Sequence, residues 1–181
     1  FDEFLIQNEL KASIRAELNK INFDDLHAVD SASQLIFDLI TSASFPDQIG
    51  TELLQQFTHI NTDVMAIRSS AITPKDKAVS WTNQLPSYLN ITIADLLDSV
   101  KRAWASFYGA KALYYRHKMN LEPSEVNLAL VIQKFIPSVI GGKVFSTHPI
   151  TNDNNQMVVE AFHGFSNKLD GGTIPADVYT V

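Results

Sequence analysis

The chain has 181 residues, of which 45% are hydrophobic and 19% charged, so it is long enough to bury a substantial core and is not a disordered segment. Its formal charge of −6 disfavours nucleic acid and anionic membranes as partners, and we expect neither. It contains no cysteine, which excludes disulfides, thiol nucleophiles and cysteine-ligated metal sites. No signal peptide or membrane-spanning run is visible, and we expect a cytoplasmic protein.

Residues 1–60 are predicted to form a helical N-terminal region. Apolar residues recur at helical spacing at Leu10, Ile14 and Leu18, and again between residues 35 and 40, where Ser31 is the expected N-cap. A third helix is expected over residues 47–57, directly after a proline, which is tolerated at a helix start. These apolar stripes indicate packing surfaces and carry no obvious chemistry.

From residue 61 onward, short apolar and alternating segments predict strands. The expected strands cover residues 64–67, 84–91, 126–133, 143–146 and 157–161. Between them, residues 93–119 are predicted to form one long helix, with Thr92 as its N-cap. Helices that precede strands, with one long helix among the strands, predict an α+β fold rather than a βαβ repeat.

Arg68 is the first candidate for a functional role, since it follows a predicted buried strand and precedes two serines. A guanidinium can bind a phosphate through two charge-assisted hydrogen bonds, and Ser69 and Ser70 can add more. The plain alternative is a surface salt bridge. The sequence has no glycine-rich phosphate loop of the GxGxxG or GxxxxGK type.

The five histidines lack the spacing of a metal site. His148 and His163 lie near predicted strand ends, beside Asp153 and Glu160, so a catalytic base is conceivable there. A hydrogen-bonded loop histidine is the simpler interpretation. Asp153, Glu160 and Asp170 could bind a divalent ion, although carboxylates near loops are usually just solvated.

Four segments occur in an order and spacing that resemble a known family. They read VMAIRSSA, SVKRAWASFYGAKALYYR, SEVNLALVIQKFIPSVIGGKVFSTHPIT and MVVEAFHG. Together they resemble the N-terminal ATP-binding domain of phosphoenolpyruvate synthase and pyruvate phosphate dikinase, which is also found in rifampicin phosphotransferases. The resemblance implies an ATP-grasp fold, in which nucleotide lies between two α+β lobes. It assigns residues 61–181 to the nucleotide-binding core, incomplete at both ends.

The resemblance implies phosphate-binding roles for four residues. Arg68 and Ser69 correspond to the family's V-R-S-S motif, whose arginine contacts the ATP phosphates. Asn83 and Ser87 fall in the stretch that closes over the phosphates, which reads G-Q-x-D-T in the family. Here Asn83 replaces the glycine and Pro86 the acidic residue, so the loop departs from the family pattern.

The adenine end of the nucleotide is assigned in the same way. The segment from Gln133 to Ile136, including Phe135, matches the hinge strand whose backbone pairs with the adenine edge. Glu160 matches the glutamate of the family's I-E-A motif. His148 falls where the family usually has asparagine, which argues against a phosphate-carrying histidine at this position.

The resemblance also implies parts that we expect outside this chain, because it starts at Phe1 and stops within a β-rich run. These are a nucleotide-gripping lysine, the acidic ligands of Mg²⁺, and the phosphohistidine and acceptor-binding domains of the same polypeptide. We therefore expect the ATP- and Mg²⁺-dependent part of a phosphoenolpyruvate synthase-like dikinase of the pyruvate, water dikinase type, with no catalytic or metal-binding residue of its own. The alternatives are a rifampicin phosphotransferase-like enzyme, a non-catalytic nucleotide-binding module and a purely structural domain.

Overall fold

The computed structural model describes residues 1–73, 79–81, 84–122, 126–164 and 175–181. The chain divides into two compact units, Phe1–Phe135 (unit 1) and Ile136–Val181 (unit 2). Mixed helices and antiparallel sheets confirm the α+β class. None of the described helices is long and apolar enough to cross a membrane.

Unit 1 begins with four helices, as the apolar periodicity predicted. They are α1 (Asp2–Gln7), α2 (Leu10–Leu18), α3 (Leu26–Ser42) and α4 (Asp47–Ile60). The predicted cap of the second helical segment was wrong: α3 begins well before Ser31, because the carboxylate of Asp25 accepts the backbone N–H of His27 and caps the helix there. Helix α4 starts directly after Pro46, as predicted.

The first sheet contains β1 (Met65–Ile72), β2 (Ser87–Ile91) and β3 (Asn127–Lys134) in the order β2-β1-β3, with both pairs antiparallel. Strand β1 is longer than predicted and includes Arg68 and both serines. Its second half alternates exposed and half-buried residues, as is typical of a strand with one open face.

The predicted long helix over residues 93–119 is in fact three consecutive elements. They are α5 (Leu96–Ala105), the 3₁₀ helix η1 (Ser106–Tyr108) and α6 (Ala110–Lys118). The break falls at Gly109, whose ψ of 147° is extended, and glycine is a poor helix former. Thr92 is not the N-cap: its hydroxyl donates to the carboxylate of Asp95 at 2.6 Å, and the helix begins after that residue.

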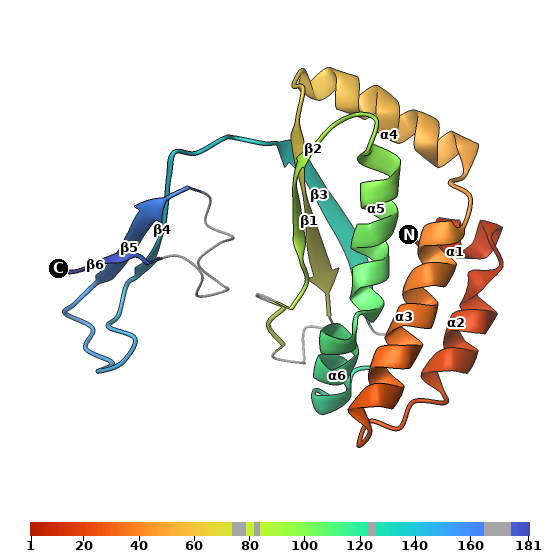
Figure 1. Cartoon of the computed structure of the whole chain (residues 1–181), viewed down its shortest axis with the longest axis horizontal. Helices are drawn as coiled ribbons and strands as arrows, with labels where there is room; N and C mark the ends of the chain where they lie inside the picture. The colour runs from red at the N-terminus through yellow and green to blue at the C-terminus, as the bar shows by residue number, and fades with distance from the viewer. Residues whose placement is uncertain (74–78, 82–83, 123–125, 165–174) are drawn as a thin grey trace. The chain divides into compact units, whose positions relative to one another are not determined.

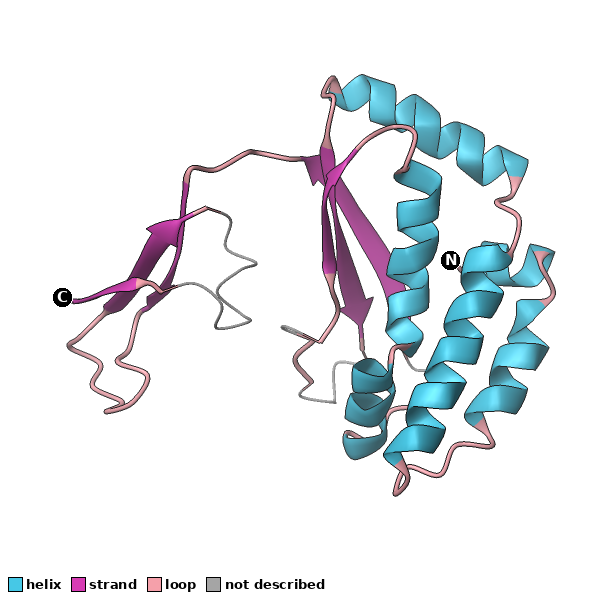
Figure 2. Cartoon of the chain, viewed as in Figure 1, coloured by secondary structure: helices cyan, strands magenta, loops and turns pink. Residues whose placement is uncertain are grey.

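Helices cover one face of this sheet (Figures 1 and 2). Helix α5 contacts all three strands, and α3 packs against α5 from the other side. The core lies between these layers; its fully buried side chains include Phe4, Ile36, Ile40, Met65, Ile67, Leu96 and Val100. The apolar stripes of the N-terminal helices therefore supply the cover of the sheet.

Unit 2 is built on a second antiparallel sheet in the order β4-β5-β6. Its strands are β4 (Ile140–Phe145), β5 (Val158–His163) and β6 (Asp177–Thr180). The contacts between residues thus separate two compact units after Phe135. The sequence predicts a boundary at residue 60, between a helical region and a nucleotide-binding core. This predicted boundary concerns the role of each part, and it stays a prediction.

Candidate functional site

The open face of the unit 1 sheet presents Arg68. Met65 and Ile67 are fully buried in the core beneath the helices. Because successive side chains of a strand point to opposite faces, Arg68 and Ser70 lie on the face away from the helices. Both are exposed. The strand thus separates a buried apolar side from a polar side on which a ligand can lie.

Strand pairing surrounds Arg68 with two close neighbours on this face. Ser87 of β2 is directly opposite Arg68 on one side, and Val131 of β3 is directly opposite it on the other. Directly opposed residues have Cβ atoms about 4.5–5.5 Å apart. Gln133 lies on the same face, two residues beyond Val131 on β3 and directly opposite Ala66. The fold therefore brings Arg68, Ser87 and Gln133 together, although they are far apart in sequence.

Within the described ranges, the structure gives the Arg68 side chain no hydrogen bond or ion pair. The salt bridges described join other residues: Lys11 with Asp2, Lys20 with Glu17, and Lys101 with Asp98. An exposed guanidinium without a protein partner keeps its donors free for an anion. The surface salt bridge considered as the plain alternative is not present among these residues.

Ser69 lies differently from Arg68. Its side chain points to the opposite face of β1, and its hydroxyl oxygen is buried without a hydrogen-bond partner among the described residues. Ser70 is the serine that shares the face of Arg68. Because side chains alternate between the two faces of a strand, a strand predicted through Arg68 would place Ser70, and not Ser69, on the same face as the arginine. A role for Ser69 stays a prediction.

The backbone of β3 decides which groups could meet an adenine edge. The N–H of Phe135 donates to the carbonyl of Val64 at 3.2 Å, so it is already used. Since backbone groups in an antiparallel pair alternate in direction, Gln133 also directs its backbone toward β1. The backbone N–H and C=O of Lys134 point away from β1. Lys134 lies within the predicted hinge segment from Gln133 to Ile136, and the strand register singles it out there.

Glu160 and Asn83 are the remaining predicted residues. Glu160 lies on β5 in unit 2, half-buried and directly opposite Lys143 of β4, which forms a cross-strand pair of opposite charges. Asn83 lies outside the described residues. Their predicted contacts with ATP stay predictions.

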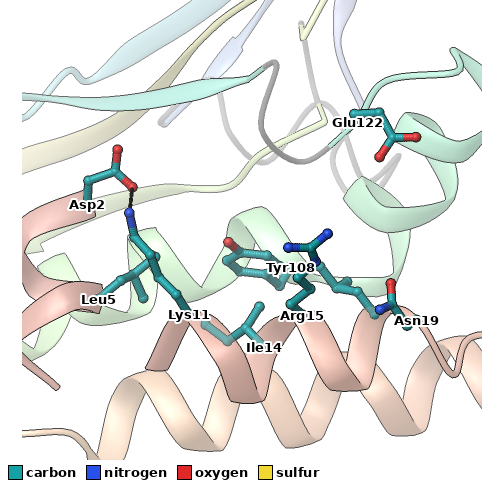
Figure 3. Close-up of a pocket in the computed structure, with 9 residues that line it drawn as sticks. Asp2, Leu5, Lys11, Ile14, Arg15, Asn19, Tyr108 and Glu122 are labelled. Carbon is teal, nitrogen blue, oxygen red and sulfur yellow. Dashed lines mark ion pairs between the residues drawn. The ribbon is translucent and has the colours of Figure 1, made fainter. Parts of the chain in front are cut away.

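A separate cavity of about 450 Å³ lies among helices α1, α2 and η1 (Figure 3). It is lined by Lys11 and Arg15 of α2, by Asn19 at the C-cap of that helix, and by Tyr108. Lys11 forms an ion pair with Asp2 at 3.2 Å. None of the predicted ATP-binding residues lines this cavity. This cavity and the candidate phosphate-binding face are therefore different places.

Tyr108, which lines this cavity, and Arg116, whose guanidinium faces the Tyr108 ring, have shifted pKa values. Burial raises the pKa of the Tyr108 phenol, and the nearby charge of Arg116 partly offsets this. Burial lowers the pKa of Arg116 to about 10. The Arg116 guanidinium lies 4.3 Å from the ring centre of Phe107 and 5.2 Å from that of Tyr108. The two terminal nitrogens of this guanidinium have no hydrogen-bond partner among the described residues. The faces of the two rings therefore provide the contacts that stabilise the buried cation.

Magnesium ligands are not assigned in the described part of the chain. It contains no group of three or more histidine and carboxylate side chains that could hold a metal ion. The residues described thus do not fit a magnesium site by themselves.

The whole chain, residues 1–181, matches the family described as "Pyruvate phosphate dikinase, AMP/ATP-binding domain". The chain belongs to this family. The resemblance read from its four segments is therefore confirmed.

Proteins that are similar to the chain in sequence agree with this family assignment. A probable phosphoenolpyruvate synthase of Pyrococcus horikoshii is 31% identical over 91% of the chain, and one of Methanothermobacter thermautotrophicus is 30% identical over all of it. An uncharacterized phosphotransferase of Bacillus subtilis is 28% identical over 99% of the chain. The chain spans only 21%, 27% and 21% of these three proteins, respectively.

Proposed function

We propose that this chain is part of the ATP-binding lobe of a phosphoenolpyruvate synthase-like dikinase, with an ATP-grasp fold. In such an enzyme, phosphate passes from ATP to a histidine in another domain of the same polypeptide and then to pyruvate. Family membership and the names of the relatives support the reaction class. The observation that carries the site is the exposed Arg68 on the open face of the sheet, directly opposite Ser87 and without a hydrogen bond or ion pair to any residue that the structure describes.

Phosphoryl transfer depends mainly on positioning and charge stabilisation, since the protein forms few covalent bonds itself. Arg68 can hold two phosphate oxygens at once through its planar fork. Ser87 and Ser70, which share its face, can each donate a hydroxyl hydrogen bond to the same group. These contacts would orient the triphosphate over the sheet and offset part of its charge.

The adenine would lie along the free edge of β3. A backbone N–H and C=O that point out from a strand match the acceptor and donor on the edge of an adenine ring. Lys134 offers such a pair, since its neighbours at Gln133 and Phe135 direct their backbones to the adjacent strand. Bound Mg²⁺ would supply charge neutralisation at the transferring phosphate. We propose its ligands in the whole protein, outside the described residues.

We also propose that the protein is cytoplasmic. Two alternative functions have to be tested against the dikinase. A rifampicin phosphotransferase-like enzyme would share the same ATP site and differ only in the final acceptor. A non-catalytic nucleotide-binding module would bind ATP without turnover, which the altered stretch at Asn83 and Pro86 makes reasonable. Incubation of the whole protein with ATP and either pyruvate or rifampicin, followed by product analysis, separates these three functions.

The test of the site is ATP affinity in the whole protein, measured by calorimetry with a non-hydrolysable ATP analogue. Hydrogen bonds to charged groups contribute about 1.5–3 kcal/mol, so Arg68→Ala should weaken binding by roughly 10- to 100-fold. Arg68→Lys should restore binding only in part, because lysine keeps the charge but loses the fork.

Arg15→Ala is the matched control, since Arg15 is another exposed arginine of unit 1 and lines the separate cavity. It should leave affinity unchanged. If Arg15→Ala weakened binding and Arg68→Ala did not, the nucleotide would lie in the cavity of Figure 3 and the proposed site would be wrong. The thermal stability of both variants without nucleotide should match the wild type, because neither side chain belongs to the core.

A further inference from the structure

One face of helix α2 forms a wall of the cavity in Figure 3. Residues three and four positions apart are neighbours on the surface of a helix. The residues of α2 and its C-cap that line the cavity follow this spacing: they are Lys11, Ile14, Arg15, Leu18 and Asn19. Polar and apolar side chains therefore share the same wall, and a molecule in the cavity would meet both kinds.

The apolar part of the cavity lining consists of Leu5, Ile14 and Leu18, and the first two of these are buried. Sites for small molecules usually have volumes of roughly 300–1,000 Å³ and combine apolar walls with a few polar groups. The cavity, at about 450 Å³, falls within this range. It thus offers both room and apolar surface for the carbon skeleton of a small molecule.

Arg15 gives the same wall a positive charge. In the part of the chain that the structure describes, its guanidinium has no ion pair, since the pairs there join other residues. The other charged side chains of the lining are already engaged. Lys11 is paired with Asp2 at 3.2 Å, and Glu122 interacts with another group of the chain. Arg15 is therefore the lining residue whose donors can hold an anion.

Arg116 adds a second positive charge at one end of the cavity. A smaller cavity of about 190 Å³, lined in part by Arg116, adjoins the first, because Leu18, Asn19 and Glu122 line both. Arg116 is only 3% exposed, and no described residue is a hydrogen-bond partner of its two terminal nitrogens. Its pKa is lowered only to about 10, so it is charged at neutral pH. A buried cation without a counter-ion is costly, and a bound anion would reduce this cost.

We propose that the two adjoining cavities bind a small organic carboxylate with an apolar body. Arg15 would hold the carboxylate through its planar fork, and the Tyr108 hydroxyl can donate a further hydrogen bond. Arg116 would attract the anion from within the wall, where water is excluded and a charge acts more strongly. The carbon skeleton would cover Leu5 and Ile14. An inorganic anion would leave these side chains against water, so the lining favours an organic ligand.

Hexanoate is a suitable probe, because it combines a carboxylate with a short alkyl chain. NMR of the full chain, titrated with hexanoate at neutral pH, measures the affinity and shows which amides respond. The amides of α2 should shift together with one dissociation constant, while those of unit 2 stay in place. Hexanamide has the same chain without the charge, and acetate has the charge without the chain. Each should bind at least about tenfold more weakly than hexanoate.

Arg15→Met tests the contact with the carboxylate, because methionine keeps much of the aliphatic stem and removes the charge. It should weaken hexanoate binding by about tenfold, the lower end for a hydrogen bond to a charged group. Arg116→Met should weaken binding by a smaller factor, since this charge acts from within the wall. Lys20→Met is the matched control: it removes an exposed cation next to Asn19, and Lys20 lines neither cavity. It should leave the affinity unchanged.

Several results would overturn the proposal. These are the absence of saturable hexanoate binding, equal binding of hexanoate and hexanamide, and unchanged affinity in Arg15→Met, which is safe for the fold because this side chain is exposed. Equal losses in Lys20→Met and Arg15→Met would reduce the effect to general charge attraction. Displacement of hexanoate by a non-hydrolysable ATP analogue would assign the cavity to the nucleotide instead.

Discussion

The two units of the molecule are both built on three-stranded antiparallel sheets, but they treat their apolar residues differently. In unit 1 helices cover one face of the sheet, and Met65 and Ile67 are completely buried. In the described part of unit 2 only Val158 and Phe162 are buried apolar residues, whereas Val144 and Val178 are 66% and 62% exposed.

The folding free energy of the chain is concentrated where apolar side chains are buried. Burial of an apolar side chain stabilises a fold by about 1.5–3 kcal/mol, and exposed side chains contribute little. Unit 1 therefore has a core, while unit 2 depends more on its backbone ladders and cross-strand pairs. We expect unit 2 to open locally more often than unit 1, as segments with few buried apolar contacts do.

The largest effect should come from Phe4→Ala. Phe4 is fully buried, with ring centres 5.1 Å from Trp104 and 5.9 Å from Phe45. Loss of this ring leaves a cavity and should lower the free energy of unfolding of unit 1 by about 3–5 kcal/mol. Both tryptophans of the chain lie in unit 1, so tryptophan fluorescence during denaturant unfolding reports on this unit alone.

Val144→Ala in unit 2 is the contrasting control, since this valine is 66% exposed and should cost less than about 0.5 kcal/mol. Amide exchange of β5 should be unchanged in Phe4→Ala if the two units are stable independently. Equal losses from the two substitutions would contradict the comparison of a packed and an open sheet.

A smaller effect, confined to unit 2, is expected from Gly142→Ala. A Cβ atom at this position would lie far inside contact distance of the Glu160 carbonyl oxygen on the paired strand. Strand β4 would have to move away from β5, at a cost of about 1–3 kcal/mol. Amide exchange across β4 and β5 should accelerate, while the fluorescence transition of unit 1 stays in place.

Gly50→Ala provides the opposite case. Gly50 lies within α4, and an added Cβ would meet Phe45 and Leu97 at ordinary contact distances of 3.5 and 3.6 Å. Alanine is the better helix former by about 1 kcal/mol, so unit 1 should become more stable. If both alanine variants destabilised the chain to the same degree, close strand approach would not explain the requirement for Gly142.

The fold was predictable from the sequence where apolar residues recur at a strong helical period. It was less predictable where a single residue sets the start or the break of a helix. The stripes over Leu10, Ile14 and Leu18 predicted α2, and Pro46 marked the start of α4. The break at Gly109 was missed because the apolar face continues across it, and the early start of α3 was missed because it depends on one carboxylate at Asp25.

The candidate site was predictable only in part, for a related reason. Arg68 is conspicuous in the sequence because it ends a buried run, but its neighbours Ser87 and Val131 are set by strand register. The different directions of Ser69 and Ser70 follow from the length of β1, which the apolar residues alone underestimate. Backbone groups such as those of Lys134 leave no trace in the side-chain pattern.

The smallest expected effect is an alkaline loss of stability that belongs to unit 1. Burial raises the pKa of Tyr108 above its ordinary value of 10. Above pH 10 the unfolded chain releases the phenolic proton while the folded chain keeps it, so the folded state binds more protons and stability falls as pH rises. One group contributes at most about 1.4 kcal/mol per pH unit. Tyr108→Phe should therefore reduce the slope of unfolding free energy between pH 9.5 and 11, measured by denaturant unfolding with tryptophan fluorescence. Burial also raises the pKa of Tyr88, which adds to this slope, whereas burial lowers the pKa of Arg116 to about 10, which opposes it. The test is therefore the difference in slope between the wild type and Tyr108→Phe. An unchanged slope in Tyr108→Phe would show that this phenol is not desolvated in the folded state, and that the cover over this part of unit 1 is more open than the structure has it.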